Sequence, residues 1–132
     1  MSIARARLQD VPAAESRIPG ALERVIAAGI TWNAVRHHTF GALRVRHFGA
    51  YPLAEDNGVR AVSTTIVNVD AGVTLYRGLR LQATILNVLD SRASDIQYLY
   101  ASRLRGEATG VSDVHVHPIE PGQLRVSLTF PP

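Results

Sequence analysis

Apolar and polar residues alternate along much of the chain, as they do in β-strands that have one apolar face. The longest example runs from Thr65 to Leu75. Its apolar face carries Thr65, Val67, Val69, Ala71, Val73 and Leu75, and its polar face carries Ile66, Asn68, Asp70, Gly72 and Thr74. Helical periodicity is weak throughout. The pattern therefore predicts a strand-rich protein.

A tight turn at Arg77-Gly78 follows this segment, and the alternation then resumes. The next apolar positions are Leu79, Leu81, Ala83 and Ile85, set against Arg80, Gln82 and Thr84. Two alternating segments joined by so short a turn predict an antiparallel β-hairpin.

Four more segments complete the predicted sheet. Leu124 to Phe130 alternates strictly, and Pro131-Pro132 must end it because proline cannot donate to a strand ladder. Ala42 to Phe48 alternates as well, and Leu22 to Trp32 is apolar enough for a strand, although Ala27-Ala28-Gly29 within it is also compatible with a helix. A short strand is expected at about Ser2 to Leu8.

These segments predict an all-β fold, an antiparallel meander of about six strands, in a single domain over residues 1–132. Connections bearing Pro and Gly fall near 11–20, 49–60 and 91–122. The last is long and shows no obvious structure. Outer-membrane barrels combine long loops at one end with short turns at the other, so this asymmetry favours a barrel over a compact soluble domain.

The two faces of the predicted strands differ in a way that suits a barrel wall. The polar face offers candidate lumen-facing residues, and the opposite face carries Val, Leu, Ile and Ala that are fit for lipid. A soluble sheet with one solvated face gives the same alternation, so both interpretations remain open at this point. The candidate lumen-facing residues are Arg44, Arg46, Asn68, Asp70, Arg80 and Gln82.

Composition narrows the class of protein. Hydrophobic residues make up 46% and charged residues 19% of the 132 residues, which excludes intrinsic disorder. No run of 18 apolar residues is present to span a bilayer as a helix, so a membrane role must use strands. Absence of cysteine excludes disulfides and thiolate chemistry. The 14 basic residues are all Arg and are spread singly, giving a net charge of +3, and this pattern does not favour nucleic-acid binding.

Few residue clusters suggest chemistry. His115 and His117 have a spacing that metal sites use, with Asp113 and Glu120 nearby, but two histidines in a polar loop need no metal. The adjacent pair His37-His38 would point to opposite faces of a strand. The acidic segment 55–58 ends in Asn-Gly and is expected to be an exposed turn. Recognised enzyme signatures are missing, so we expect no catalytic residue, no metal and no cofactor.

The C-terminal half resembles a known family. Asn87-Val88-Leu89-Asp90 and the residues after it resemble the end of the penultimate strand, and the following loop, of TonB-dependent outer-membrane receptors. The stretch from Tyr98 to Pro121 looks like their last extracellular loop, and the final strand follows in the same order. Segments 17–21, 43–49 and 52–57 are similar to barrel segments of one branch of this family, so the resemblance covers nearly the whole chain.

The resemblance implies a receptor of about 22 strands around an N-terminal plug, which takes up iron chelates or other nutrients with energy from TonB. This chain matches only the final strands. It shows no signal peptide, TonB box or plug domain, and Phe130 is followed by two prolines where the family ends on an aromatic residue. Six strands cannot close into a barrel within a membrane. The expected partners are therefore outer-membrane lipid and either the remaining barrel strands or other copies of this chain. TonB itself would act only through the missing N-terminal region.

Three hypotheses follow. The first is a C-terminal barrel fragment of such a receptor in the outer membrane, with a substrate-side loop carrying Tyr98, Tyr100, Arg103, Asp113, His115 and His117. The second is a small soluble β-sheet protein derived from that segment, which binds a partner or self-assembles. The third, a metal-dependent enzyme using His115 and His117, has the least support. Trp32 and the tyrosines fit either an interfacial aromatic girdle or ordinary packing.

Overall fold

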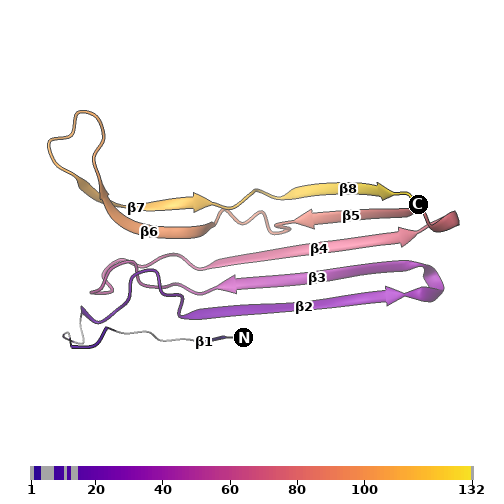
Figure 1. Ribbon diagram of the computed structural model, residues 1–132, viewed down its shortest axis with the longest axis horizontal. Helices are drawn as coiled ribbons and strands as arrows, with labels where there is room; N and C mark the ends of the chain where they lie inside the picture. Colours follow the sequence, from indigo (N-terminus) through magenta and orange to yellow (C-terminus); the bar gives the residue numbers. More distant parts are fainter. Residues whose placement is uncertain (1, 4–7, 11, 13–14, 132) are drawn as a thin grey trace. The chain divides into compact units, whose positions relative to one another are not determined.

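In the computed structural model, which describes residues 2–3, 8–10, 12 and 15–131, the regular structure is almost entirely β (Figure 1). Two short 3-10 turns, η2 (Val35–His37) and η3 (Tyr76–Gly78), connect neighbouring strands. The strands are β1 (Ser2–Ile3), β2 (Arg24–Ala34), β3 (Thr39–Phe48), β4 (Thr64–Thr74), β5 (Arg80–Leu86), β6 (Ser94–Ser102), β7 (Val111–Pro118) and β8 (Gln123–Thr129). None of the described helices has the length and apolar character needed to cross a bilayer.

Six of the strands form one sheet in the order β1-β2-β3-β4-β5-β8, and β6 pairs with β7 in a second sheet. The pairs β1 with β2, β4 with β5, β5 with β8 and β6 with β7 are all antiparallel. The all-β class and the antiparallel meander of about six strands are confirmed.

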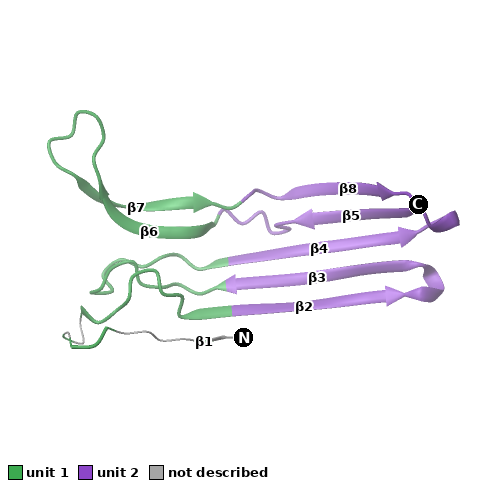
Figure 2. Ribbon diagram, viewed as in Figure 1, with its two compact units in different colours: residues 1–25, 48–64, 93–119 green, residues 26–47, 65–92, 120–132 purple. Residues whose placement is uncertain are grey.

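The chain divides into two compact units (Figure 2). We call residues 26–47, 65–92 and 120–132 the sheet unit, because they contain most of β2, β3 and β4 together with β5 and β8. We call residues 1–25, 48–64 and 93–119 the hairpin unit, because β6 and β7 form its hairpin.

The predicted hairpin at Arg77-Gly78 is confirmed. Arg77 and Gly78 have φ angles of 60° and 79°, the left-handed conformations that match the twist of a two-stranded ribbon. The register that follows places Val73 opposite Leu81 and Asp70 opposite Thr84. Apolar residues therefore pair with apolar residues, and polar with polar.

Three details of the sequence prediction need correction. The connection at 91–122 is not a structureless loop, because it contains β6 and β7. Val114 and Val116 do alternate with Asp113, His115 and His117 in β7, but so short an alternation does not distinguish a strand from the loop that the family resemblance implies. Residues 27–29 lie within β2, so the helical alternative is wrong. Of the strand expected at Ser2 to Leu8, residues 2–3 form β1 and residues 4–7 lie outside the described residues.

A small hydrophobic cluster stabilises the hairpin unit. Tyr51, Leu53 and Ala61 are buried there, and Val59 and Leu99 pack against them. The segment between β3 and β4 supplies four of these five residues, and Leu99 comes from β6. The cluster therefore joins the β6–β7 hairpin to the segment at 51–61 within the same unit.

Asn87 holds together the strand ends of the sheet unit. This residue is 4% exposed, and its φ of 48° is left-handed. Its Nδ2 donates to the carbonyls of Ser91 (3.2 Å) and Glu120 (3.1 Å), and its Oδ1 accepts from the Ser91 amide (3.0 Å). The Asn87 amide donates to Oδ1 of Asn68 on β4 (3.0 Å). One buried side chain thus ties the turn after β5 to the segment that leads into β8.

Replacing Asn87 should destabilise the protein more than a typical surface change. We expect Asn87→Ala to lower the free energy of unfolding by about 2 to 4 kcal/mol, because buried backbone groups lose partners and alanine is strained at positive φ. Asn87→Gly, which tolerates the backbone conformation, should cost about 1 kcal/mol less. Equilibrium urea unfolding measures both, and a wild-type value for Asn87→Ala would contradict the assigned role.

Candidate functional site

One face of the sheet unit carries apolar side chains in rows that cross β4, β5 and β8. The backbone pairing sets these rows, because each strand places every second residue on the same face. The three rows are Val69, Ile85 and Leu124; Ala71, Ala83 and Val126; and Val73, Leu81 and Leu128.

These rows are not covered within the sheet unit. Leu124, Val126 and Leu128 on β8 expose 67%, 65% and 50% of their surface. Among the described residues of this unit, Ala42 is the only buried hydrophobic side chain. A water-soluble sheet normally covers its apolar face with a second layer, because exposed apolar rows are unfavourable in water. The apolar face is therefore open to a partner or to an apolar solvent.

Trp32 extends the apolar face toward β2. Gly41 on β3 makes room for it, since a Cβ atom there would overlap the indole ring. Ile30, two residues before Trp32 on the same strand, lies on the same face and is 67% exposed. The indole is 44% exposed, so it packs on the sheet while still facing outward.

The opposite face carries a network of polar side chains across β3, β4 and β5. Arg44 forms an ion pair with Asp70. The Thr84 hydroxyl donates to the other carboxylate oxygen of Asp70 at 2.7 Å, and Gln82 donates to Thr84 at 3.4 Å. Both carboxylate oxygens of Asp70 therefore have a partner, and this face of the sheet is polar and hydrogen-bonded.

All six residues expected on the polar face lie on that one face of the sheet. Beyond the network just described, Asn68 accepts the Asn87 amide, and the Arg80 guanidinium lies 4.2 Å from the centre of the Phe40 ring. Arg46 lies two residues after Arg44 on the same face of β3 and forms no ion pair with any described residue. The structure thus brings together Arg44, Asp70 and Gln82 through Thr84, while Arg46 and Arg80 stand apart from that network.

In the hairpin unit, Gln97 anchors the β6–β7 hairpin through its inner face. Its backbone amide and carbonyl each lie 3.2 Å from the Tyr51 hydroxyl. Its side-chain amide accepts from the Val62 amide and donates to the Val62 carbonyl, both at 3.0 Å. The Gln97 side-chain amide therefore pairs with the Val62 backbone as a neighbouring strand would, and it links β6 to the segment before β4.

The outer face of the same hairpin carries three stacked rings. Tyr98 and Tyr100 lie two residues apart on β6, and His115 lies opposite Tyr98 on β7. The Tyr100 and His115 ring centres are 3.9 Å apart, and Tyr98 lies 5.5 Å from Tyr100 and 5.7 Å from His115. Each tyrosine is 47% exposed. The anchored hairpin thus presents a fixed aromatic surface on which a planar ligand could stack.

The other residues predicted for the substrate-side loop are engaged locally and do not converge on the stack. Arg103 donates its Nε to the Glu107 carbonyl at 2.8 Å, and Asp113 accepts the neighbouring Val114 amide at 2.7 Å. His117 donates Nδ1 to Asp95 at 2.7 Å. Of the six predicted residues, the structure therefore joins Tyr98, Tyr100 and His115 only.

No metal centre is evident in the described ranges, where no three His, Asp or Glu side chains lie close enough to share an ion. The Nε2 atom of His115 is buried and has no hydrogen-bond partner, since it lies within the aromatic stack. His37 lies in η2, and His38, which follows it, has a left-handed backbone, so the adjacent pair belongs to a turn and not to a strand.

The sequence did not indicate the residues that hold these surfaces in place. Gln97 carries no sequence signal, Asn87 enters only as the first residue of the segment that resembles the family, and Tyr51 fits either a girdle or ordinary packing. The one available signal was Asn87, because Asn is favoured at positive φ. The pairing of Phe40 with Arg80 spans 40 residues and had no local signal.

Comparison with protein-family models, with curated proteins and with solved structures found no match to this chain.

The His117–Asp95 pair makes the hairpin sensitive to acid. The hydrogen bond from His117 lowers the pKa of the Asp95 carboxyl below its usual value. Because this folded pKa is depressed, the pair stabilises the hairpin at pH above the usual Asp pKa, and the contribution is lost as the pH falls through the lowered value. We expect carbon NMR titration to show this lowered pKa, and His117→Ala to raise it. His115→Ala is the control, because His115 does not contact Asp95, and equal effects of the two changes would contradict the assignment.

Proposed function

We propose that this chain is a wall segment of an outer-membrane β-barrel, from the C-terminal part of a TonB-dependent receptor that takes up iron chelates or other nutrients. In this role the chain performs no chemistry. Its apolar face contacts outer-membrane lipid, its polar face lines the water-filled lumen, and neighbouring barrel strands or other copies of the chain complete the wall.

One observation carries this proposal: the sheet unit is a single layer with exposed apolar rows on one face and a hydrogen-bonded polar network on the other. A bilayer is the solvent that matches the first face, and the aqueous lumen matches the second. Alternation of this kind without a second layer is what a barrel wall requires and what a soluble sheet avoids.

The order of segments adds support. The Asn-Val-Leu-Asp segment that resembles the family follows β5, and a final strand, β8, pairs back onto β5. The role of Asn87 gives the resemblance a physical reason, since this residue joins the strand end to the segment before β8. In the proposed receptor the stacked rings of Tyr98, Tyr100 and His115 contact the ligand.

Fluorescence of Trp32, the only tryptophan, tests the lipid assignment. With the chain reconstituted in phospholipid vesicles, lipids brominated on their acyl chains should quench Trp32 strongly, because the indole lies on the apolar face. The matched control moves the indole by one residue to the polar face, as Thr31→Trp with Trp32→Phe, and should be quenched much less. Equal quenching of the two proteins would contradict the proposal. A chain that stays monodisperse without detergent and does not insert into the vesicles would favour the soluble β-sheet protein instead.

A charge on the apolar face provides a second test. We expect Val126→Arg, in the middle row, to destabilise the bilayer-embedded protein by about 2 to 4 kcal/mol, since a guanidinium near the bilayer centre is costly. Ser127→Arg is the matched control on the polar face and should change the free energy of unfolding by less than about 1 kcal/mol. Guanidinium unfolding in vesicles measures both. Because Val126 is 65% exposed, a harmless Val126→Arg would mean that water, and not lipid, covers this face.

A further inference from the structure

Arg80 is held in a defined position by an aromatic support on the polar face of the sheet unit. Gly72 on β4 has no side chain, and a Cβ atom there would overlap the Phe40 ring. The ring can therefore lie flat across β4. The Arg80 guanidinium stacks on it, with Cζ 4.2 Å from the ring centre, in a cation–π arrangement. No hydrogen bond joins the N–H groups of Arg80 to another described residue, so they remain available.

The available edge of Arg80 has no acidic partner among the residues that the structure describes. Arg44 on the same face differs, because Asp70 neutralises it. A guanidinium that is ordered by stacking but unpaired is suited to bidentate recognition of a carboxylate or phosphate group.

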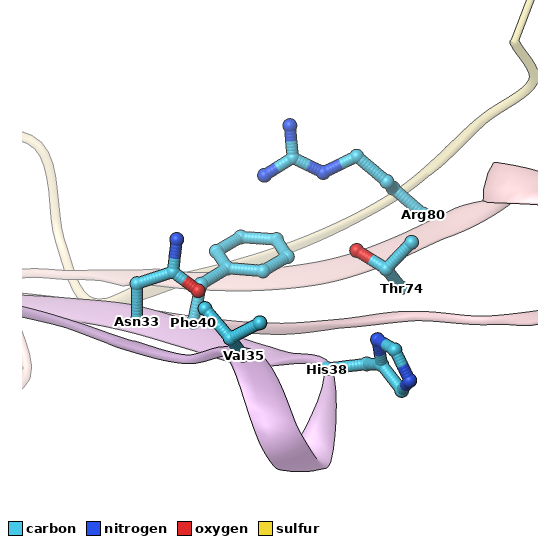
Figure 3. A pocket seen from close by; sticks show the side chains of 6 residues that line it. All are labelled: Asn33, Val35, His38, Phe40, Thr74 and Arg80. Atoms are coloured by element: carbon cyan, nitrogen blue, oxygen red, sulfur yellow. The ribbon is translucent and has the colours of Figure 1, made fainter.

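A cavity of about 380 Å³ opens beside Arg80, near the turns η2 and η3. Figure 3 shows its lining, with the Arg80 guanidinium and the Asn33 amide directed to the same side as the Phe40 ring. The lining residues are Asn33, Val35, His38, Phe40, Thr74 and Arg80. They offer a guanidinium, an imidazole, an amide and a hydroxyl as hydrogen-bond donors, and none is acidic.

We propose that this cavity is a binding site for a small anion that carries a carboxylate or phosphate group. The Arg80 fork binds two oxygens of the anionic group, and the Thr74 hydroxyl and the Asn33 amide donate to oxygens that remain. Cations are disfavoured because no carboxylate lines the cavity. This site is separate from the aromatic stack of the hairpin unit, and its existence does not depend on the membrane assignment.

Calorimetric titration of the full chain with inorganic phosphate and, separately, with citrate tests the proposal and distinguishes the two anion classes. We expect saturable binding of at least one. Arg80→Gln should weaken it by about tenfold or more, because a charge-assisted bidentate contact is lost. Arg80→Lys keeps the charge but not the planar fork, and should weaken binding by a smaller factor. Phe40→Leu removes the ring beneath the guanidinium and should weaken binding although Arg80 itself is unchanged.

The matched control is Arg46→Gln, because Arg46 is an unpaired arginine on the same face that does not line this cavity. Its affinity for the anion should stay within about twofold of wild type, since a distant surface charge is largely screened. Equal losses in Arg46→Gln and Arg80→Gln would reduce the effect to general electrostatic attraction and overturn the site. No binding of either anion by a wild-type chain with its normal circular dichroism spectrum would also overturn it.

Discussion

The register of the β4–β5–β8 ladder is the constraint on which the rest of the sheet unit depends. The side chains of a strand alternate with a period of two, so a slip of one residue would exchange the two faces completely. In the observed register every apolar row is continuous across the three strands, and the polar network of Asp70, Thr84 and Gln82 stays on the other face. A pair of left-handed residues at Arg77-Gly78 sets this register locally, because it fixes which residues face each other after the turn.

Two buried polar side chains, Asn87 and Gln97, join neighbouring segments of this protein through hydrogen bonds. Asn87 satisfies backbone groups at the strand ends of the sheet unit, and Gln97 does so between β6 and the neighbouring segment of the hairpin unit. Losing such a group leaves unpaired buried donors and acceptors, which costs more than the net gain of an ordinary hydrogen bond. These contacts satisfy backbone groups but do not cover the apolar rows of the sheet unit, which remain exposed.

The two units present different kinds of surface. The sheet unit offers an extended apolar face and a polar face with one ordered, unpaired arginine above Phe40. The hairpin unit offers three stacked rings on a strand pair that is anchored from behind. Among the described residues, no three His, Asp or Glu side chains gather on either surface.

The sequence by itself determined the all-β class, the β4–β5 hairpin with its Arg77-Gly78 turn, the final strand and the residues of each face, because these follow from local alternation and turn chemistry. For Leu22 to Trp32 it left a helix open, since Ala27-Ala28-Gly29 is compatible with either structure. It did not separate β6 and β7 from a long loop, because their alternation is short, as in Val114 and Val116 against His115 and His117. Only the tertiary structure decided which side chains meet. The Asn87 contacts, the Gln97 anchor, the stacking of Tyr100 on His115 and the support of Arg80 by Phe40 above Gly72 all join distant segments. Their partners are selected by strand pairing, which a single strand's pattern does not specify.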